Sequence, residues 1–377
     1  MGIGRLRRAK DADIWLPAIV GVLLLGGVIM VYSASAMWAD TNFSGDSFFF
    51  LRQIVWVIVS VAMMMLISRI DYRRMEKWVW VLLICSFALL VLVLFTRPIS
   101  GARRWIDLYF FKLQPSEIFK YVLIIFLAAM LAAKKDKIRH LRSVLFPALP
   151  VLAVGFGLIL AEPNLGTVLI LSLMVLVLLF VAGIRVQLLA LFSGAIGLVA
   201  YLMVFVGGYK IDRIHAWWNA LEDPLQAGYQ VKQSILAIGS GGVIGAGLGR
   251  GSAKMLYLPA PHTDFIFATL AEEGGFIIVM LLLLLYLLFI WRGTHIAMHA
   301  PDLFGFFIAV GVTTIIGGQA LMNLMVATAL IPVTGLPLPL LSYGGSSLIL
   351  TCCGIGLLLA VSRQRVASPQ LFRGGAQ

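Results

Sequence analysis

Charged residues are scarce in this sequence, at 12% of 377 residues, whereas a soluble globular chain carries about 25%. Hydrophobic residues make up 61% of the chain and its mean hydropathy is +1.00. So little charge excludes both a soluble globular protein and a disordered chain, because each of these exposes far more polar surface. The composition indicates a polytopic membrane protein.

Cysteine is also rare, and the three residues Cys85, Cys352 and Cys353 all lie in apolar stretches. Their spacing provides neither a disulfide framework nor a set of metal ligands. We therefore expect buried structural thiols and no metal site built from cysteine. Motifs for RNA or DNA binding are also missing, so the net charge of +12 does not indicate a nucleic-acid partner.

Long apolar runs dominate what remains. Ten of them are long enough to cross ~30 Å of hydrocarbon as helices. We predict an all-α, polytopic membrane protein that forms a single domain over residues 1–377, with ten transmembrane helices. A large outer loop at 209–263 separates helices seven and eight, and residues 1–13 and 362–377 are tails. The expected spans are 14–34, 53–68, 78–95, 117–133, 143–161, 167–184, 187–208, 264–290, 303–325 and 345–361.

Basic residues predict the orientation of these helices, because cytoplasmic connections are enriched in Lys and Arg. Short outer connections at 162–166 and 330–343 carry neither residue, which places both termini in the cytoplasm. The predicted inner segments hold most of the positive charge: Arg5, Arg7, Arg8, Lys10, Arg69, Arg73, Arg74, Lys77, Lys134, Lys135, Lys137, Arg139, Arg142, Arg185, Arg292, Arg363, Arg365 and Arg373.

One short outer connection, Thr96–Gln114, breaks this charge rule. It holds Arg97, Arg103, Arg104 and Lys112. Four cations in a short outer segment oppose the topology and need another reason to be there. An anionic ligand on the outer face is the simplest reason.

The long outer segment 209–263 also carries cations, among them Arg213, but long loops escape the charge rule. Its sequence is helical in pattern at 229–238, and seven glycines follow from Gly239 to Gly251. Glycine permits positive φ and close backbone approach. The segment does not resemble a dinucleotide site, since no strand precedes it. It is either a flexible surface loop or a folded loop over a cavity.

Polar side chains also occur at membrane depth or at its edge. Glu117 and Lys120 are three residues apart and share one helix face. They form either a structural pair or a substrate-holding pair. Intramembrane ionisable groups usually line a cavity or pathway. The others of this kind are Glu162, Asn164, Glu272, Glu273, Gln319 and Asn323.

Asp264 is the strongest catalytic candidate. It lies between the prolines Pro259 and Pro261 and a membrane-length apolar run. A carboxylate beside hydrocarbon is costly to keep charged, so it needs a polar cavity, a partner or a chemical role. The alternative is an aspartate that caps the start of a helix.

The chain resembles the SEDS family of bacterial peptidoglycan polymerases, whose name stands for shape, elongation, division and sporulation. The resemblance covers nearly the whole chain and is densest between residues 101 and 356. The stretches that carry it are Gly101–Ile106, Gln114–Lys120, Glu162–Thr167, Gly228–Gln230, Gln233–Ser234, Ala237–Gly242, Leu258–Pro259, His262–Phe267 and Pro337–Ser347.

Membership would imply ten transmembrane helices, a bacterial inner-membrane location and an active site on the outer face. It would also imply polymerisation of lipid II and, as partners, a class B penicillin-binding protein transpeptidase and other divisome or elongasome membrane proteins. Tyr257–Pro259 and Val326–Thr328 favour the division or sporulation members over the elongation members. Three departures from the family pattern are Asn164 for Asp, Ala260 for Glu and Gly274 for Leu.

The family's essential aspartate corresponds to Asp264, which is therefore expected to be the general base. Candidates for binding the substrate are Arg103, Arg104, Lys112, Glu117, Lys120, Arg213, Glu272 and Ser342. No cofactor is assigned, and a divalent cation near Asp264 remains open. A lipid II flippase is the alternative function. Polar groups that gather on one side of the membrane favour the polymerase, because a transport pathway needs them across its full depth.

Overall fold

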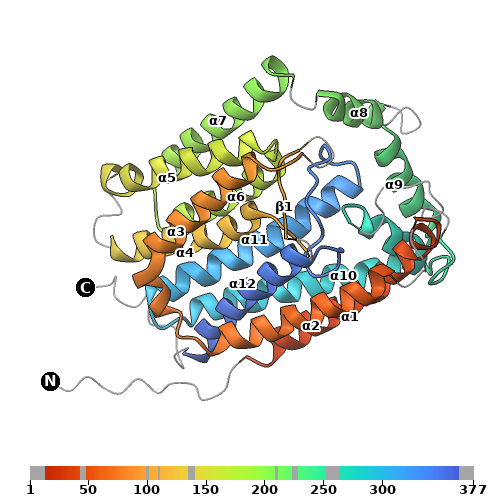
Figure 1. Ribbon diagram of the computed structural model, residues 1–377, viewed down its shortest axis with the longest axis horizontal. Coiled ribbons are helices and arrows are strands. Elements are labelled where there is room, and N and C mark those ends of the chain that lie inside the picture. Colours follow the sequence, from red (N-terminus) through yellow and green to blue (C-terminus); the bar gives the residue numbers. More distant parts are fainter. Residues whose placement is uncertain are drawn as a thin grey trace.

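The computed structural model describes residues 13–42, 48–98, 102–108, 111–134, 141–208, 211–222, 228–251 and 263–364. These residues form a bundle of long helices, with one short hairpin (Figure 1). The helices are α1 Trp15–Asn42, α2 Phe48–Arg69, α3 Arg73–Leu94, α4 Pro115–Ala133, α5 Leu141–Ala161, α6 Leu165–Val181, α7 Val186–Tyr201, α8 Ile211–Glu222, α9 Tyr229–Ser240, α10 Ile266–Met298, α11 Leu303–Ala327 and α12 Gly345–Arg363. A π-helical turn, η2 Leu202–Val206, continues α7, and β1 Ile106–Asp107 pairs with β2 Lys112–Leu113.

Eight helical segments among the described residues are long and apolar enough to cross a membrane. Two shorter apolar segments, Pro147–Ala161 of α5 and Leu165–Val181 of α6, accompany them. The predicted all-α, polytopic membrane protein is confirmed. The number of ten crossings stays a prediction, because α6 and the Pro147–Ala161 part of α5 are shorter than the other eight segments.

The helices differ in how they are buried. α4 and α11 lie at the centre, and most of their residues are buried. Such helices are apolar on all sides because every face meets another helix. α7 has no buried residue and lies at the edge of the bundle (Figure 1). The edge position leaves α7 with few internal restraints.

Ion pairs join the helices at one end of the bundle. Asp13 pairs with Arg292 near the end of α10. Arg73, at the start of α3, pairs with Asp302 at 2.7 Å in the turn before α11. Gln364, after α12, donates to the α2–α3 turn at 3.1 Å. The beginning of α1 and the end of α12 therefore lie at the same end, as the predicted topology requires.

The predicted span 264–290 corresponds to α10, but the helix is broken at Gly275, where φ is 65° and ψ is −169°. Backbone groups freed by the break bond to the glycine-rich segment instead. Phe276 N donates to Gly242 O at 2.9 Å, and Ala246 N donates to Glu272 O at 2.9 Å. Of the two alternatives for this segment, the folded one is therefore correct for the residues described up to 251.

The cysteine prediction holds only in part. Cys352 is buried in α12 and Cys353 is partly exposed. Cys85 is exposed, so its predicted burial is wrong. Hydropathy alone does not distinguish a helix face that meets lipid from one that meets protein, since both are apolar.

Candidate active site

Asp264 lies just before α10 and is partly buried. Its backbone carbonyl accepts a hydrogen bond from Asn323 Nδ2 at 2.8 Å, and the preceding Thr263 carbonyl accepts one from Ser342 Oγ at 2.6 Å. The N-cap residue of α10 is Phe265, which is buried and has no side-chain cap. The helix-capping alternative for Asp264 is therefore wrong, and α11 and the segment before α12 position its backbone.

Two amides on one face of α11 hold the segment before α12 in place. Gln319 Nε2 donates to Pro337 O at 2.9 Å, and Asn323 Nδ2 donates to Leu336 O at 2.9 Å. Because Asn323 also holds Asp264, one side chain ties the aspartate to the buried segment at residues 336–341. The expected shared face of Gln319 and Asn323 is confirmed.

Arg213 of α8 reaches the same place from the large outer segment. Its Nη1 donates to Val333 O at 3.0 Å. A Cβ built at Gly335 would lie 3.7 Å from Asp264 Oδ2 and 3.9 Å from Arg213 Nη1. The carboxylate and the guanidinium thus flank one glycine, whose φ of +75° favours glycine there. A cation stands beside the predicted base.

Glu117 and Lys120 form an ion pair of 2.8 Å at the start of α4, with only 2% and 1% of their side chains exposed. Lys120 Nζ also donates to Gln319 Oε1 at 2.9 Å, and Ser347 Oγ donates to Glu117 Oε2 at 3.2 Å. The predicted shared face is confirmed. Because Gln319 bonds the 336–337 segment as well, hydrogen bonds connect this pair to the support of Asp264.

Two cations of the 96–114 connection donate to backbone carbonyls. Arg103 Nη1 donates to Leu94 O at 2.9 Å, and Arg104 Nε donates to Glu162 O at 3.1 Å. Lys112 is exposed on β2, opposite Asp107. Arg104 therefore joins this connection to the α5–α6 turn. These contacts give the two arginines a structural reason that the charge pattern did not reveal.

The α5–α6 turn itself contains a buried acid. Both carboxyl oxygens of Glu162 are buried with no hydrogen-bond partner among the described residues. Burial raises the pKa of Glu162 to about 8, and the positive charge of Arg104 offsets this only in part. Asn164 caps α6 by accepting from Thr167 N at 3.4 Å. Asparagine caps a helix as well as aspartate does, so this departure from the family pattern preserves the cap.

Glu272 faces a different neighbour from Asp264. It is 2% exposed, and a Cβ at Gly251 would lie 2.7 Å from its Oε2. The adjacent Glu273 accepts from Ser33 Oγ of α1 at 2.7 and 2.6 Å. The two glutamates therefore pack against the glycine-rich segment and α1, whereas Asp264 lies against Gly335.

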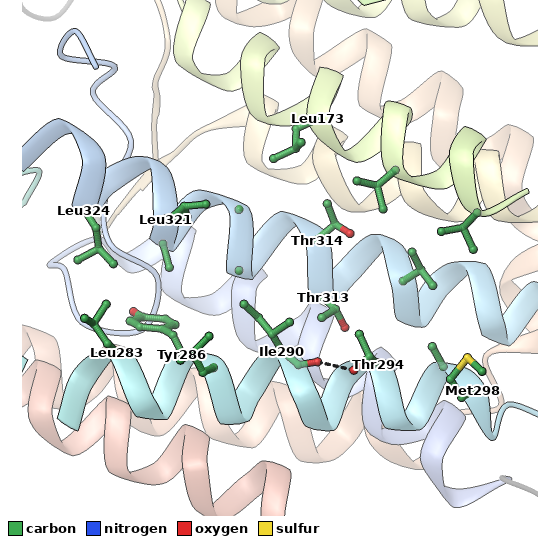
Figure 2. A pocket seen from close by; sticks show the side chains of 18 of the residues that line it. Leu173, Leu283, Tyr286, Ile290, Thr294, Met298, Thr313, Thr314, Leu321 and Leu324 are labelled. Atoms are coloured by element: carbon green, nitrogen blue, oxygen red, sulfur yellow. Dashed lines mark hydrogen bonds between the residues drawn. The ribbon is translucent and has the colours of Figure 1, made fainter. Parts of the chain in front are cut away.

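The two largest of three apolar cavities among the described residues differ in their lining. The first, of about 500 Å³, lies between α6, α7, η2, α8 and α11, and Arg213 is the only charged residue in its lining. The second, of about 530 Å³, lies between α6, α10 and α11 and has no charged residue in its lining. Figure 2 shows this second cavity, with Leu283, Tyr286 and Ile290 of α10 facing Leu321 and Leu324 of α11. Only the first leads to the polar groups around Asp264.

Sequence reasoning missed Arg52 of α2. Arg52 is an exposed cation near the start of α2. Its guanidinium carbon lies 4.4 Å from the centre of the Phe48 ring. It also hydrogen-bonds Tyr343, the residue after Ser342. The charge rule that singled out the 96–114 connection applies equally to the preceding outer connection. Arg52 joins the candidate cations for this reason.

The residues around Asp264 offer few side chains that could bind a metal ion. In the described part of the chain, no group of three or more His, Cys, Asp or Glu could hold one. Asp264 stands beside Arg213, whose positive charge disfavours a second cation there. These residues do not fit a resident divalent cation, and no catalytic step is assigned to one.

Comparison with known proteins gives a consistent result. The family model for the FtsW, RodA and SpoVE cell cycle proteins matches residues 14–367. Stage V sporulation protein E of Bacillus subtilis is 45% identical over 94% of this chain and 98% of its own length. A probable peptidoglycan glycosyltransferase FtsW of Trichlorobacter lovleyi is 40% identical over 94% of each chain.

Solved structures agree in fold. The rod shape determining protein RodA of Thermus thermophilus superposes with a TM-score of 0.71 at 31% identity, covering 95% of this chain and 98% of its own. A chain from a peptidoglycan synthase complex that coordinates polymerization and crosslinking superposes at 0.77, with 31% identity and coverage of 94% and 98%. The relatives named for division and sporulation support the expected subtype. The protein belongs to the FtsW, RodA and SpoVE family of cell cycle proteins.

Proposed function

We propose that this protein is a peptidoglycan glycosyltransferase that polymerises lipid II on the outer face of the bacterial cytoplasmic membrane. One observation carries the proposal. A carboxylate and a guanidinium flank Gly335, and the guanidinium also lines the end of an apolar cavity. A base, a cation and a channel for a lipid chain are the three elements that transfer from a lipid pyrophosphate requires.

The reaction joins two lipid-linked disaccharides. The C4 hydroxyl oxygen of one GlcNAc attacks C1 of the MurNAc of the other, and the C1–O bond to the pyrophosphate breaks. The electron pair leaves with undecaprenyl pyrophosphate, and Asp264 takes the hydroxyl proton. Base catalysis of this kind is worth ~10²–10⁴-fold.

The leaving pyrophosphate carries negative charge and needs a positive partner rather than an acid. Arg213 is the first choice because it stands beside Asp264, and its planar fork binds phosphate oxygens in pairs. Lys120 is held by Glu117 and Gln319, so in this proposal it positions Gln319 and does not bind the substrate. Arg52, Arg103, Arg104 and Lys112 are weaker candidates for binding the pyrophosphate. Ser342 holds the backbone at Thr263, beside Asp264, and Glu272 packs against the glycine-rich segment.

The cavity beside Arg213 is proposed to take the polyprenyl chain of one substrate. Its walls are apolar and include Gly197, Ala200 and Val204 of the α7 and η2 edge. A lipid chain in this cavity would place its pyrophosphate at the polar end. Since α7 has no buried residue, moving it to admit a chain disrupts little internal packing.

A partner is expected to accompany the polymerase. One solved relative belongs to a peptidoglycan synthase complex that coordinates polymerization and crosslinking. We propose a class B penicillin-binding protein transpeptidase as the partner of this chain, within a set of divisome or elongasome membrane proteins. We also propose that both termini are cytoplasmic, as the distribution of basic residues predicts.

Reconstitution tests the proposed function. The protein and its cognate transpeptidase are placed in vesicles with fluorescent lipid II, and glycan products are separated by size. Polymer from the wild type and none from Asp264→Asn is the expected result. Movement of lipid II between leaflets by both proteins, without polymer from either, would support a flippase and contradict the proposal.

A further inference from the structure

The glycine-rich segment after α9 contains an unusually long uncharged stretch for an outer loop. Between Lys232 and Arg250 the sequence has no charged residue. The segment is neither an expected span nor a helix of spanning length. Its composition resembles that of the membrane helices more than that of a water-exposed loop.

Its large side chains point away from the protein. Val243 is 66% exposed, Ile244 80% and Leu248 65%. The neighbouring part of α10 has the same character, since Phe276 and Ile277 are each 57% exposed in a helix of spanning length. The apolar surface of the turn is therefore continuous with a helix face that meets lipid.

Hydrogen bonds to α10 satisfy part of the backbone of the turn. Gly247 N donates to Glu273 O at 3.0 Å and Ile277 N donates to Val243 O at 3.3 Å, in addition to the two bonds that cross the break at Gly275. Irregular backbone is tolerated at membrane depth only where protein groups satisfy it. The break in α10 and the turn thus provide hydrogen-bond partners for each other's backbone at four positions.

The glycines make this contact close. A Cβ at Gly241 would lie 2.1 Å from Ala271 O, and a Cβ at Gly245 would lie 2.2 Å from Glu273 O. Any other residue at these positions would push the turn away from α10. The glycine pattern is therefore explained by docking against a helix rather than by flexibility.

The depth of the break agrees with this contact. Gly275 lies roughly 26 Å from Arg292 along α10, at about 1.5 Å per residue. Arg292 pairs with Asp13 at the opposite end of the bundle. With a hydrocarbon core of ~30 Å, Gly275 falls just inside the edge nearest Asp264.

We infer that residues 241–248 form a re-entrant turn that inserts Val243, Ile244 and Leu248 shallowly among the acyl chains of the leaflet nearest Asp264. The backbone of this turn packs against α10 at the break at Gly275 and hydrogen-bonds to it there. The inserted turn attaches the first part of α10, which follows Asp264, to the lipid as well as to the bundle. This inference concerns the bilayer and does not depend on the proposed reaction.

Site-specific fluorescence quenching tests the insertion. Ile244→Cys is made in a full-length variant with Cys85, Cys352 and Cys353 changed to Ser, labelled with bimane and placed in nanodiscs whose lipids carry bromine near the top of the acyl chain. Ile277→Cys provides a reference in lipid, and Gln230→Cys, exposed at the start of α9, provides one in water. Bimane at Ile244 is expected to be quenched as much as at Ile277 and several times more than at Gln230.

Val243→Cys is measured as well, so that a folding defect at one position does not decide the result. Quenching at both positions no greater than at Gln230, together with rapid labelling by a membrane-impermeant maleimide in vesicles, would overturn the inference. Quenching that is strongest with bromine deep in the chain would overturn the shallow placement.

Discussion

The two larger apolar cavities among the described residues have similar volumes, but only one of them has a charged residue in its lining. The cavity between α6 and α7 ends at Arg213, whereas the cavity between α10 and α11 has no charged residue in its lining. Either could hold an acyl chain, because both are apolar and face the side of the bundle. Only the first could also hold the pyrophosphate of a lipid-linked sugar. Size and apolarity therefore do not identify a substrate site here, and the single cation does.

The largest expected effect concerns the base at the charged end. Asp264→Asn keeps the shape of the side chain and removes its basicity. Polymerisation of lipid II by the reconstituted protein should fall at least ~10²-fold, the lower range for base catalysis. Asp212→Asn, an exposed acid one residue before Arg213, is the matched control and should retain activity. Near-normal polymer from Asp264→Asn would remove the base from the mechanism.

The second prediction concerns the cation itself. Arg213→Ala should lower kcat/KM about 10–100-fold, because a hydrogen bond to a charged group is worth about 1.5–3 kcal/mol. Arg213→Lys should recover part of the loss, since it keeps the charge and loses the planar fork. Arg250→Ala, exposed at the end of the glycine-rich segment, serves as control. If Arg213→Ala and the control are equally active, the cation does not mark the first cavity as the substrate site.

A smaller effect is expected from filling the first cavity. Gly197 lines it and Gly194 does not, although both are on α7 with open space around them. Gly197→Phe should raise KM for lipid II several-fold and leave kcat nearly unchanged, because it takes the space of the lipid chain. Gly194→Phe should do neither. If Thr314→Phe, in the second cavity, raises KM as much as Gly197→Phe, the assignment of the lipid chain is wrong.

The smallest effect concerns stability near the first cavity, at Glu162. The folded protein keeps this carboxyl protonated up to about pH 8, while the unfolded chain releases the proton near 4.5. Stability is therefore fully present below the ordinary pKa and falls as pH rises through that window. Glu162→Gln should match the wild type in Tm at pH 5 and exceed it by several degrees at pH 8. Thermal unfolding in nanodiscs measures this.

The exposed acid Glu76 provides the control, since Glu76→Gln should follow the wild type at each pH. A constant difference in Tm between Glu162→Gln and the wild type across the window would show that the carboxyl of Glu162 does not titrate there.

Much of the fold follows from the sequence because hydropathy and helical spacing are local. The apolar runs predicted the membrane helices, and the spacing of three predicted that Glu117 and Lys120 would meet. The break at Gly275 escaped prediction because a glycine inside an apolar run leaves hydropathy unchanged. Its cause lies in residues 242–247, about thirty positions earlier in the chain.

The site was predictable to a lesser degree. Asp264 stood out because a carboxylate beside hydrocarbon is costly. Its support by Asn323 and its closeness to Arg213 depend on three distant segments that meet only after folding. Arg104 was assigned to a ligand by its charge, yet its hydrogen bond to Glu162 O shows that an unusual cation can also serve the backbone.

The buried pair of Glu117 and Lys120 fixes the position of α4 relative to α11 and α12. Apolar helix faces in lipid slide easily, because every register buries a similar surface. A shift of α4 by one turn, about 5.4 Å, would separate Lys120 from Gln319 and Glu117 from Ser347. α4, α11 and α12 thus form a rigid frame, and any movement during a catalytic cycle falls to helices at the edge of the bundle such as α7.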